Sequence, residues 1–168
     1  MIDACCVRSA HRDDLPMLLS WRNHPEVRSF MFSRHEIGLD EHAAWFATAS
    51  RDITRRLLVI EDQDLPLGYV QFANIASGGI AEWGFYTRPG APRGSGRRLG
   101  SAALDHAFTV LGLHKVCGQA IASNAASIAL HQKLHFVQEG VLREHQQIEG
   151  TYHSLVCFGL LKHEWCGG

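Results

Sequence analysis

A glycine- and arginine-rich segment, residues 92–100 (Pro-Arg-Gly-Ser-Gly-Arg-Arg-Leu-Gly), constrains the fold of this chain more than any other feature. The residues before it, Ile80–Tyr86, are mostly apolar and aromatic and predict a β-strand. After it, apolar side chains recur at helical spacing as far as Leu111, which predicts a helix. The chain therefore runs from a strand through a tight turn into a helix.

The turn has the chemistry of a pyrophosphate site. Gly94 and Gly96 let the backbone take left-handed conformations without a Cβ penalty, so that successive N–H groups can face one concavity. The N-terminus of the following helix adds partial positive charge. Three arginines with side chains suited to phosphate flank the turn: Arg93, Arg97 and Arg98. The alternative is a glycine turn with a solvated basic rim. No Gly-Lys-Ser/Thr follows, and Leu99 breaks the dinucleotide-binding pattern G-x-G-x-x-G.

Two segments resemble the GNAT superfamily of N-acetyltransferases. Arg93-Gly94-Ser95-Gly96 is similar to the acetyl-CoA pyrophosphate loop of that family, Q/R-x-x-G-x-G/A, with Arg98 at a position usually held by Gly or Ala. Residues 124–136 are similar to the family segment N-x-x-A-x-x-L-Y-x-K-x-G-F. In this second segment His131 stands at the usual Tyr and His135 at the usual Gly.

The resemblance implies one GNAT domain over residues 1–168, with an α/β fold in which helices flank a mixed sheet and the central strands splay apart. It also implies that the cofactor is acetyl-CoA, held by backbone groups of Phe85, Tyr86 and Thr87, by the loop residues Ser95 and its neighbours from Arg93 to Arg98, and by Asn124. Asn124 is also a candidate helix N-cap, which asparagine favours, and both roles can hold together. The expected strands are 5–8, 56–61, 67–74, 80–86, 115–121, 136–143 and 152–161. The expected helices are one that follows Asp14, a short one over 26–32, one that starts within 39–46, one that follows the glycine-rich turn as far as Leu111, and one over 125–134.

Composition narrows the class of protein and its partners. The 168 residues are 46% hydrophobic and 20% charged, which is typical of a soluble globular domain. A net charge of −1 gives no general reason to expect nucleic acid or an anionic membrane as partner. The five cysteines form no C-x-x-C pair, and together with the absence of a signal peptide or spanning segment they favour the cytoplasm. In the family fold a C-terminal strand can pair between two copies, which leaves a homodimer open.

Acetyl transfer to an amine needs a base for the amine and a proton for the departing CoA thiolate. His131, at the family's tyrosine position, is a chemically competent proton donor, because an unperturbed imidazole has a pKa of about 6.5. The alternative is a histidine that only packs. Glu82 is the one carboxylate on the strand before the loop, and it is the candidate base, acting through water. The alternative is a strand residue that only faces outward. His131 and His135 have the spacing of a metal pair, but without a recognisable third ligand we expect no metal.

The N-terminal half carries the pattern Trp21-Arg22-Asn23 followed by Glu41-His42-x-x-Trp45. With Glu164-Trp165 it resembles one GNAT subfamily, the UDP-4-amino-4,6-dideoxy-N-acetyl-β-L-altrosamine N-acetyltransferases of bacterial pseudaminic acid synthesis for flagellin glycosylation. The resemblance implies a UDP-linked 4-amino sugar as acceptor, bound by Arg22, His42, Asn74 and Tyr86. Arg22 would meet the phosphates of the nucleotide.

Three other functions stay open at this stage. One is acetylation of a protein N-terminus, as in ribosomal-protein acetyltransferases, whose strand resembles residues 81–86. A polyamine acceptor is less favoured, because no acidic cluster marks the N-terminal half. The third is an acetyl-CoA sensor without turnover, which the departures at Arg98, His131 and His135 allow.

Overall fold

The computed structural model describes residues 5–167, which form one seven-stranded mixed sheet with the strand order β1-β2-β3-β4-β5-β7-β6. Neighbouring strands are antiparallel except β4 and β5, which are parallel. The strands are β1 (Cys6–Ser9), β2 (Arg56–Asp62), β3 (Leu65–Ala73), β4 (Ile80–Thr87), β5 (Lys115–Ile121), β6 (Val137–Ile148) and β7 (Thr151–Leu161). The helices are α1 (Leu15–Asn23), α2 (Pro25–Arg28), α3 (Leu39–Ala49), α4 (Ser95–Thr109) and α5 (Ala125–Lys133), with 3-10 turns η1 (Arg12–Asp14) and η2 (Lys162–Glu164).

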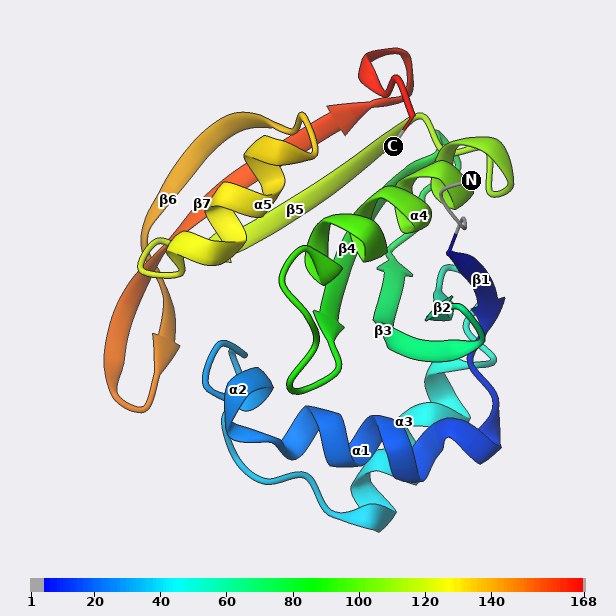
Figure 1. Cartoon of the computed structure of the whole chain (residues 1–168). Helices are drawn as coiled ribbons and strands as arrows, with labels where there is room; N and C mark the ends of the chain where they lie inside the picture. Colours follow the sequence, from blue (N-terminus) through cyan, green and yellow to red (C-terminus); the bar gives the residue numbers. More distant parts are fainter. Residues whose placement is uncertain (1–4, 168) are drawn as a thin grey trace.

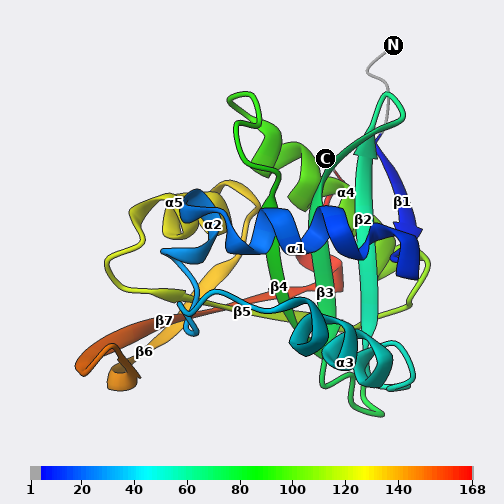
Figure 2. The same cartoon turned by 90° about the horizontal axis from the view of Figure 1, so that it is seen from below.

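Helices cover both faces of the sheet (Figures 1 and 2). On one face, α4 buries Leu99, Leu104 and Phe108 in the main core, which includes side chains from β2, β3, β4, β5 and β7. On the other face, Leu18 of α1 and Ala49 of α3 pack on β2 and β3 in a smaller core. The alternation of side chains along each strand supplies both layers, because successive residues point to opposite faces.

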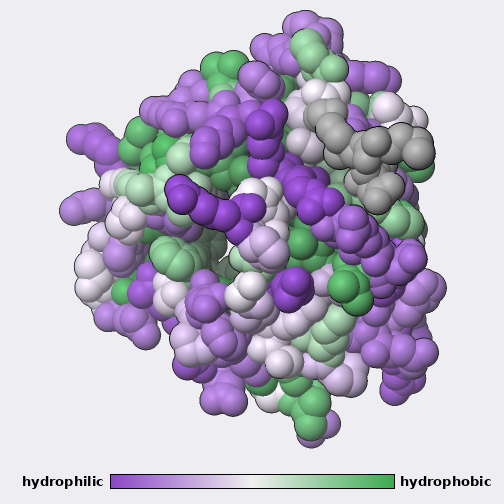
Figure 3. Space-filling view, in the orientation of Figure 1, coloured by the Kyte–Doolittle hydropathy of each residue, from purple (hydrophilic) through white to green (hydrophobic). Residues whose placement is uncertain are grey.

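The sheet opens between its two central strands. β4 pairs with β5 only from Ile80 to Glu82, opposite Lys115 to Cys117, and beyond this point the strands diverge, as Figure 1 shows. β5 instead continues along its whole length with β7. Trp83–Thr87 of β4 therefore has no strand partner on the β5 side, which confirms the expected splay. In the same orientation, Figure 3 shows the surface hollowed near the middle of this face.

Several element ends differ from expectation. The helix expected over residues 26–32 ends at Arg28, because the aromatic side chains that follow have no core to pack against: Phe30 is 54% exposed and Phe32 is 43% exposed. β6 runs to Ile148 rather than Arg143, since it stays paired with β7 as far as the turn at Glu149-Gly150. No helix within residues 5–167 is long and apolar enough to cross a membrane.

The helix end at His135 explains why a glycine would suit this position. The N–H of Phe136 donates to the carbonyl of His131, and the N–H of His135 donates to the carbonyl of Gln132, which is the Schellman arrangement. His135 has a φ of 66°, in the left-handed region that glycine adopts freely. The segment therefore keeps the family geometry while placing an exposed imidazole where the family usually has no side chain.

Candidate active site

The loop between β4 and α4 presents free backbone donors at the edge of the splay. Gly94 has a φ of 93° and is the residue before α4. In the described part of the chain, the N–H groups of Gly94, Gly96 and Arg97 have no hydrogen-bond acceptor, whereas the N–H of Ser95 donates to Pro92. Unpaired N–H groups at a helix N-terminus suit an anionic ligand. The structure thus fits the pyrophosphate expected here.

Two of the expected cofactor ligands have other partners. The guanidinium of Arg98 forms an ion pair with Asp62 at the turn between β2 and β3, and its role as a phosphate ligand, which would compete with this pair, stays a prediction. The side chain of Asn124 accepts a hydrogen bond from the N–H of Ser127 at 3.1 Å and caps α5, which confirms the predicted N-cap. Arg93 and Arg97 are exposed beside the free donors and remain predicted phosphate ligands.

The histidine at the tyrosine position is a core residue. His131 is 1% exposed, stacks on Phe158 with ring centroids 4.6 Å apart, and has both ring nitrogens engaged. Its Nδ1–H donates to the carbonyl of Ser127 at 2.8 Å, and its Nε2 accepts the indole N–H of Trp83 at 3.1 Å. Burial lowers the pKa of His131, so the neutral imidazole is favoured. This geometry corrects the expectation that His131 protonates the thiolate.

The same packing accounts for Gly118 on β5. A Cβ there would lie 2.5 Å from Nε2 of His131 and 2.7 Å from the indole nitrogen of Trp83. Contacts this close require the imidazole and the indole to shift. The absence of a side chain at this position is therefore what lets the histidine and the tryptophan meet under the sheet.

We expect the variant H131F to lose stability without losing a catalytic proton donor. The indole N–H of Trp83 would lose its acceptor, which costs about 1–3 kcal/mol when the group is buried. Because the folded pKa of His131 lies below its unfolded value, its contribution is fully present above about pH 6.5 and is lost as the pH falls through the folded pKa. Urea unfolding at pH 8 and pH 5.5 should show a lower free energy of unfolding in H131F and a weaker loss on acidification.

The matched control is H135N, at the exposed end of the same helix, which should change neither quantity appreciably. If H131F were as stable as the wild type but lacked one limb of the pH profile of kcat, this result would assign His131 a role as catalytic proton donor.

Glu82 lies where the splay begins. It is exposed, ends the pairing of β4 with β5, and accepts a hydrogen bond at Oε2 from Nδ2 of Asn74 at 3.1 Å. Asn74 has a φ of 54°, which turns the chain directly after β3. In the structure Asn74 therefore bonds the candidate base, Glu82, and not the other residues predicted to bind the acceptor substrate.

Arg22 lies within electrostatic reach of His42 and Tyr86, although the sequence separates the three residues. Nη2 of Arg22 donates to the carbonyl of Ser33 at 2.8 Å, while its Nη1 is buried without a partner among the described residues. Burial and the charge of Arg22 lower the pKa of His42. Tyr86 places its hydroxyl 3.5 Å from the carbonyl of Leu18 and is close enough for Arg22 to influence its pKa, which burial raises. The unpaired guanidinium nitrogen is a buried donor that an oxygen of a ligand or of water would satisfy.

The sequence did not reveal two residues that hold this region together. Asn23 donates from Nδ2 to the carbonyl of Ile37 and accepts the N–H of the same residue, both at 2.8 Å, which fixes the segment between α2 and α3. Glu26 accepts the N–H of Gly90 at 3.0 Å and so ties α2 to the β4–α4 loop. These three bonds join residues that are 14 or more positions apart, and no local pattern signals them.

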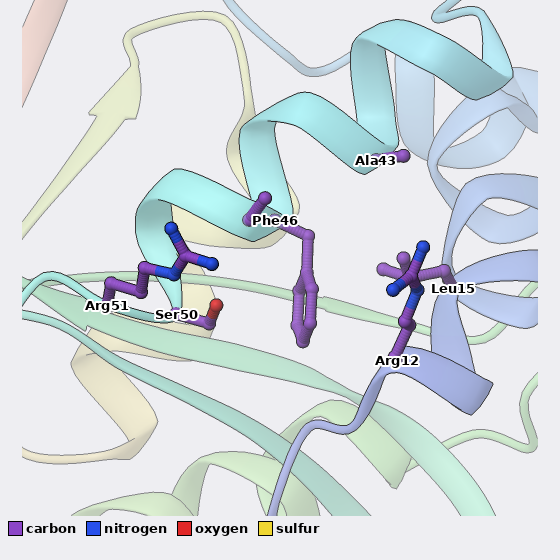
Figure 4. A pocket seen from close by; sticks show the side chains of 7 residues that line it. Arg12, Leu15, Ala43, Phe46, Ser50 and Arg51 are labelled. Atoms are coloured by element: carbon purple, nitrogen blue, oxygen red, sulfur yellow. The ribbon is translucent and has the colours of Figure 1, made fainter.

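Two hollows lie elsewhere, between α1 and α3. One is lined by Arg12, Leu15, Ala43, Phe46, Ala47, Ser50 and Arg51, most of which are labelled in Figure 4, and its neighbour reaches His42. Neither includes a residue of β4 or of the β4–α4 loop, so we do not place the chemistry there. Within residues 5–167, no three or more His, Cys, Asp or Glu side chains are arranged to hold a metal ion.

Comparison with known proteins agrees with the splayed sheet and the donor-lined loop. Residues 5–137 match the model of the acetyltransferase (GNAT) domain, and the chain belongs to this family. A solved spermidine N-acetyltransferase of Vibrio cholerae, in complex with CoA and spermine, superposes with a TM-score of 0.87 at 27% identity over 95% of this chain and 96% of that one. The protein is therefore an acetyl-CoA-dependent N-acetyltransferase, which sets aside a sensor without turnover.

Three relatives have names that point to no common acceptor: one name specifies spermidine, one a ribosomal substrate, and one no acceptor at all. The spermidine N(1)-acetyltransferase of V. cholerae is 29% identical over 152 residues, which are 89% of this chain and 88% of that protein. The acetyltransferase PseH of Campylobacter jejuni is 25% identical over 123 residues, which are 73% of this chain and 76% of that protein. A ribosomal N-acetyltransferase of Bacillus subtilis, itself named as putative, is 36% identical over 64 residues, 38% of this chain and 35% of that protein. These relatives therefore share the family, but they do not share a named acceptor.

Proposed function

We infer that the protein acetylates the 4-amino group of a UDP-linked 4-amino-4,6-dideoxy sugar, as in pseudaminic acid synthesis for flagellin glycosylation. The observation that carries this proposal is the buried, unpaired Nη1 of Arg22, within electrostatic reach of His42 and Tyr86. A guanidinium in this setting matches the phosphates of a nucleotide sugar. The resemblance of Trp21-Arg22-Asn23 and Glu41-His42-x-x-Trp45 to the nucleotide-sugar subfamily supports the same acceptor class.

The charges around α2 argue against a polyamine. Three carboxylates of this region have partners: Glu26 accepts the N–H of Gly90, Glu36 lies near Arg28 at 3.9 Å, and Glu41 bonds His35 at 2.9 Å. A cationic acceptor would meet the free guanidinium of Arg22 without a carboxylate reserved for it, and like charges in a partly buried site repel. Spermidine is nevertheless the second candidate, because of the overall likeness to spermidine N-acetyltransferases.

The chain's own residues supply the remaining steps. Bound acetyl-CoA would supply the acetyl thioester, with the free N–H groups of Gly94, Gly96 and Arg97 holding its pyrophosphate. Glu82, fixed by Asn74, accepts the proton of the acceptor amine through water. Since His131 is buried and engaged, solvent at the open splay protonates the thiolate.

The test is free-thiol release from acetyl-CoA with three acceptors: a UDP-4-amino-4,6-dideoxy sugar, a peptide with a free N-terminus, and spermidine. We expect turnover with the nucleotide sugar. In the variant R22M its KM should rise about 10- to 100-fold, because a hydrogen bond to a charged group contributes about 1.5–3 kcal/mol. R22K should restore part of the affinity.

N23A is the matched control, since it frees the same loop without removing a charge. An equal rise of KM in N23A and R22M would assign the effect to loop order, and turnover restricted to spermidine or peptide would overturn the proposed acceptor.

A further inference from the structure

β3 and β4 form the part of the sheet that lies between the candidate base and Arg22. Along one face of β4, Glu82, Gly84 and Tyr86 follow one another at alternate positions. Their partners in register on β3 are Ala73, Gln71 and Tyr69 respectively. Glu82 is exposed at the splay, whereas Tyr86 lies under α1 and near Arg22. The pair Gln71 and Gly84 is therefore midway between the two ends of the site.

Gly84 has no side chain, and the side chain of Gln71 lies beside the space that this leaves above β4. A Cβ on Gly84 would lie 3.5 Å from Nε2 of Gln71, so the amide lies over the glycine. Both residues are partly exposed. Among the six residues of this patch, Gln71 is the one polar side chain between Glu82 and the tyrosine pair, whose rings are tilted by 33° with centroids 5.3 Å apart.

The orientation of the amide is fixed from one side. The hydroxyl of Tyr69 donates to Oε1 of Gln71 at 3.3 Å. The ring of Tyr69 is 5% exposed and packed against Trp45 and Tyr86, so it holds the hydroxyl in place. With Oε1 engaged, the two hydrogens on Nε2 remain available, and in the described part of the chain Nε2, on a partly exposed side chain, donates to no protein acceptor.

We propose that Gln71 is a specificity-determining residue, whose Nε2 donates a hydrogen bond to an acceptor oxygen next to the reacting amine, a ring hydroxyl or an acetamido carbonyl. This rests on the proposed nucleotide-sugar acceptor. With Arg22 holding the phosphates at one end, the amide orients the sugar ring so that its amine faces Glu82 at the other. A polyamine has no oxygen to accept this bond, so the same group favours a sugar.

The test is a double-mutant cycle of Q71L and Y69F with the UDP-4-amino-4,6-dideoxy sugar. Leucine keeps the bulk of Gln71 but cannot donate, so kcat/KM should fall about 10-fold. Y69F releases the amide and should lower kcat/KM about 3-fold in the wild-type background. In the Q71L background Y69F should have no further effect, since the tyrosine acts only through the amide. The affinity for acetyl-CoA and the melting temperature should not change in Q71L.

The outcomes separate the two proposals. Wild-type turnover with the sugar and unchanged kcat/KM in Q71L would overturn the role of Gln71 and leave the acceptor assignment intact. Independent, additive losses in the cycle, or a parallel loss of acetyl-CoA affinity, would likewise overturn it in favour of a structural role. A wild type that acetylates only spermidine would overturn the acceptor and the hydrogen bond together.

Discussion

The variant G94V is expected to weaken acetyl-CoA binding by about 100-fold or more. Gly94 has a φ of 93°, which a β-branched residue avoids, although nothing lies within 4 Å of the added Cβ. Relief of this strain would rotate the free N–H groups of Gly94, Gly96 and Arg97 away from one another. Each hydrogen bond to a charged group contributes about 1.5–3 kcal/mol, so the loss of two accounts for an effect of this size. Titration calorimetry with acetyl-CoA measures it directly.

Gly90 offers a matched control in the same loop. It has a φ of 66° and equally open surroundings, but it lies outside the group of free donors and its N–H already bonds Glu26. G90V imposes a similar backbone strain, and we expect it to change acetyl-CoA affinity much less. Equal weakening in G90V and G94V, or wild-type affinity in G94V, would contradict the pyrophosphate assignment.

The variant E82Q is expected to lower kcat about 100-fold near neutral pH, the usual scale of general base catalysis. The amide keeps the size of Glu82 and can still bond Asn74, so acetyl-CoA affinity should not change. As the pH rises, a larger fraction of the acceptor amine is already deprotonated and needs no base. The difference in kcat between E82Q and the wild type should therefore become smaller toward alkaline pH. Steady-state kinetics from pH 6 to pH 10 with the nucleotide sugar provide the measurement.

The control is E139Q, which makes the same change at an exposed carboxylate of β6 that bonds Lys115 at 2.6 Å. It should leave kcat nearly unchanged at every pH. A deficit of E82Q that stays constant with pH would indicate a structural role, and a normal kcat would assign proton removal to solvent.

Local patterns predicted the elements that matter for the cofactor. The strand at residues 115–121 was predicted with the same ends as β5, and the strand, turn and helix around the glycine-rich loop lie where the spacing placed them. These features depend on residues close in sequence, such as alternating apolar side chains and glycines at a turn. The family resemblance implied the splay between β4 and β5, which is confirmed.

The sequence by itself determined the donor-lined loop at Gly94, because the loop depends on short-range backbone geometry, and it implied the fold through its resemblance to a known family. Only the tertiary structure decided which polar side chains are free. It buried His131 between Trp83 and Phe158, paired Arg98 with Asp62, and left a nitrogen of Arg22 without a partner. The physical reason is that burial and pairing are set by contacts between residues far apart in the chain, whose distances no local pattern records.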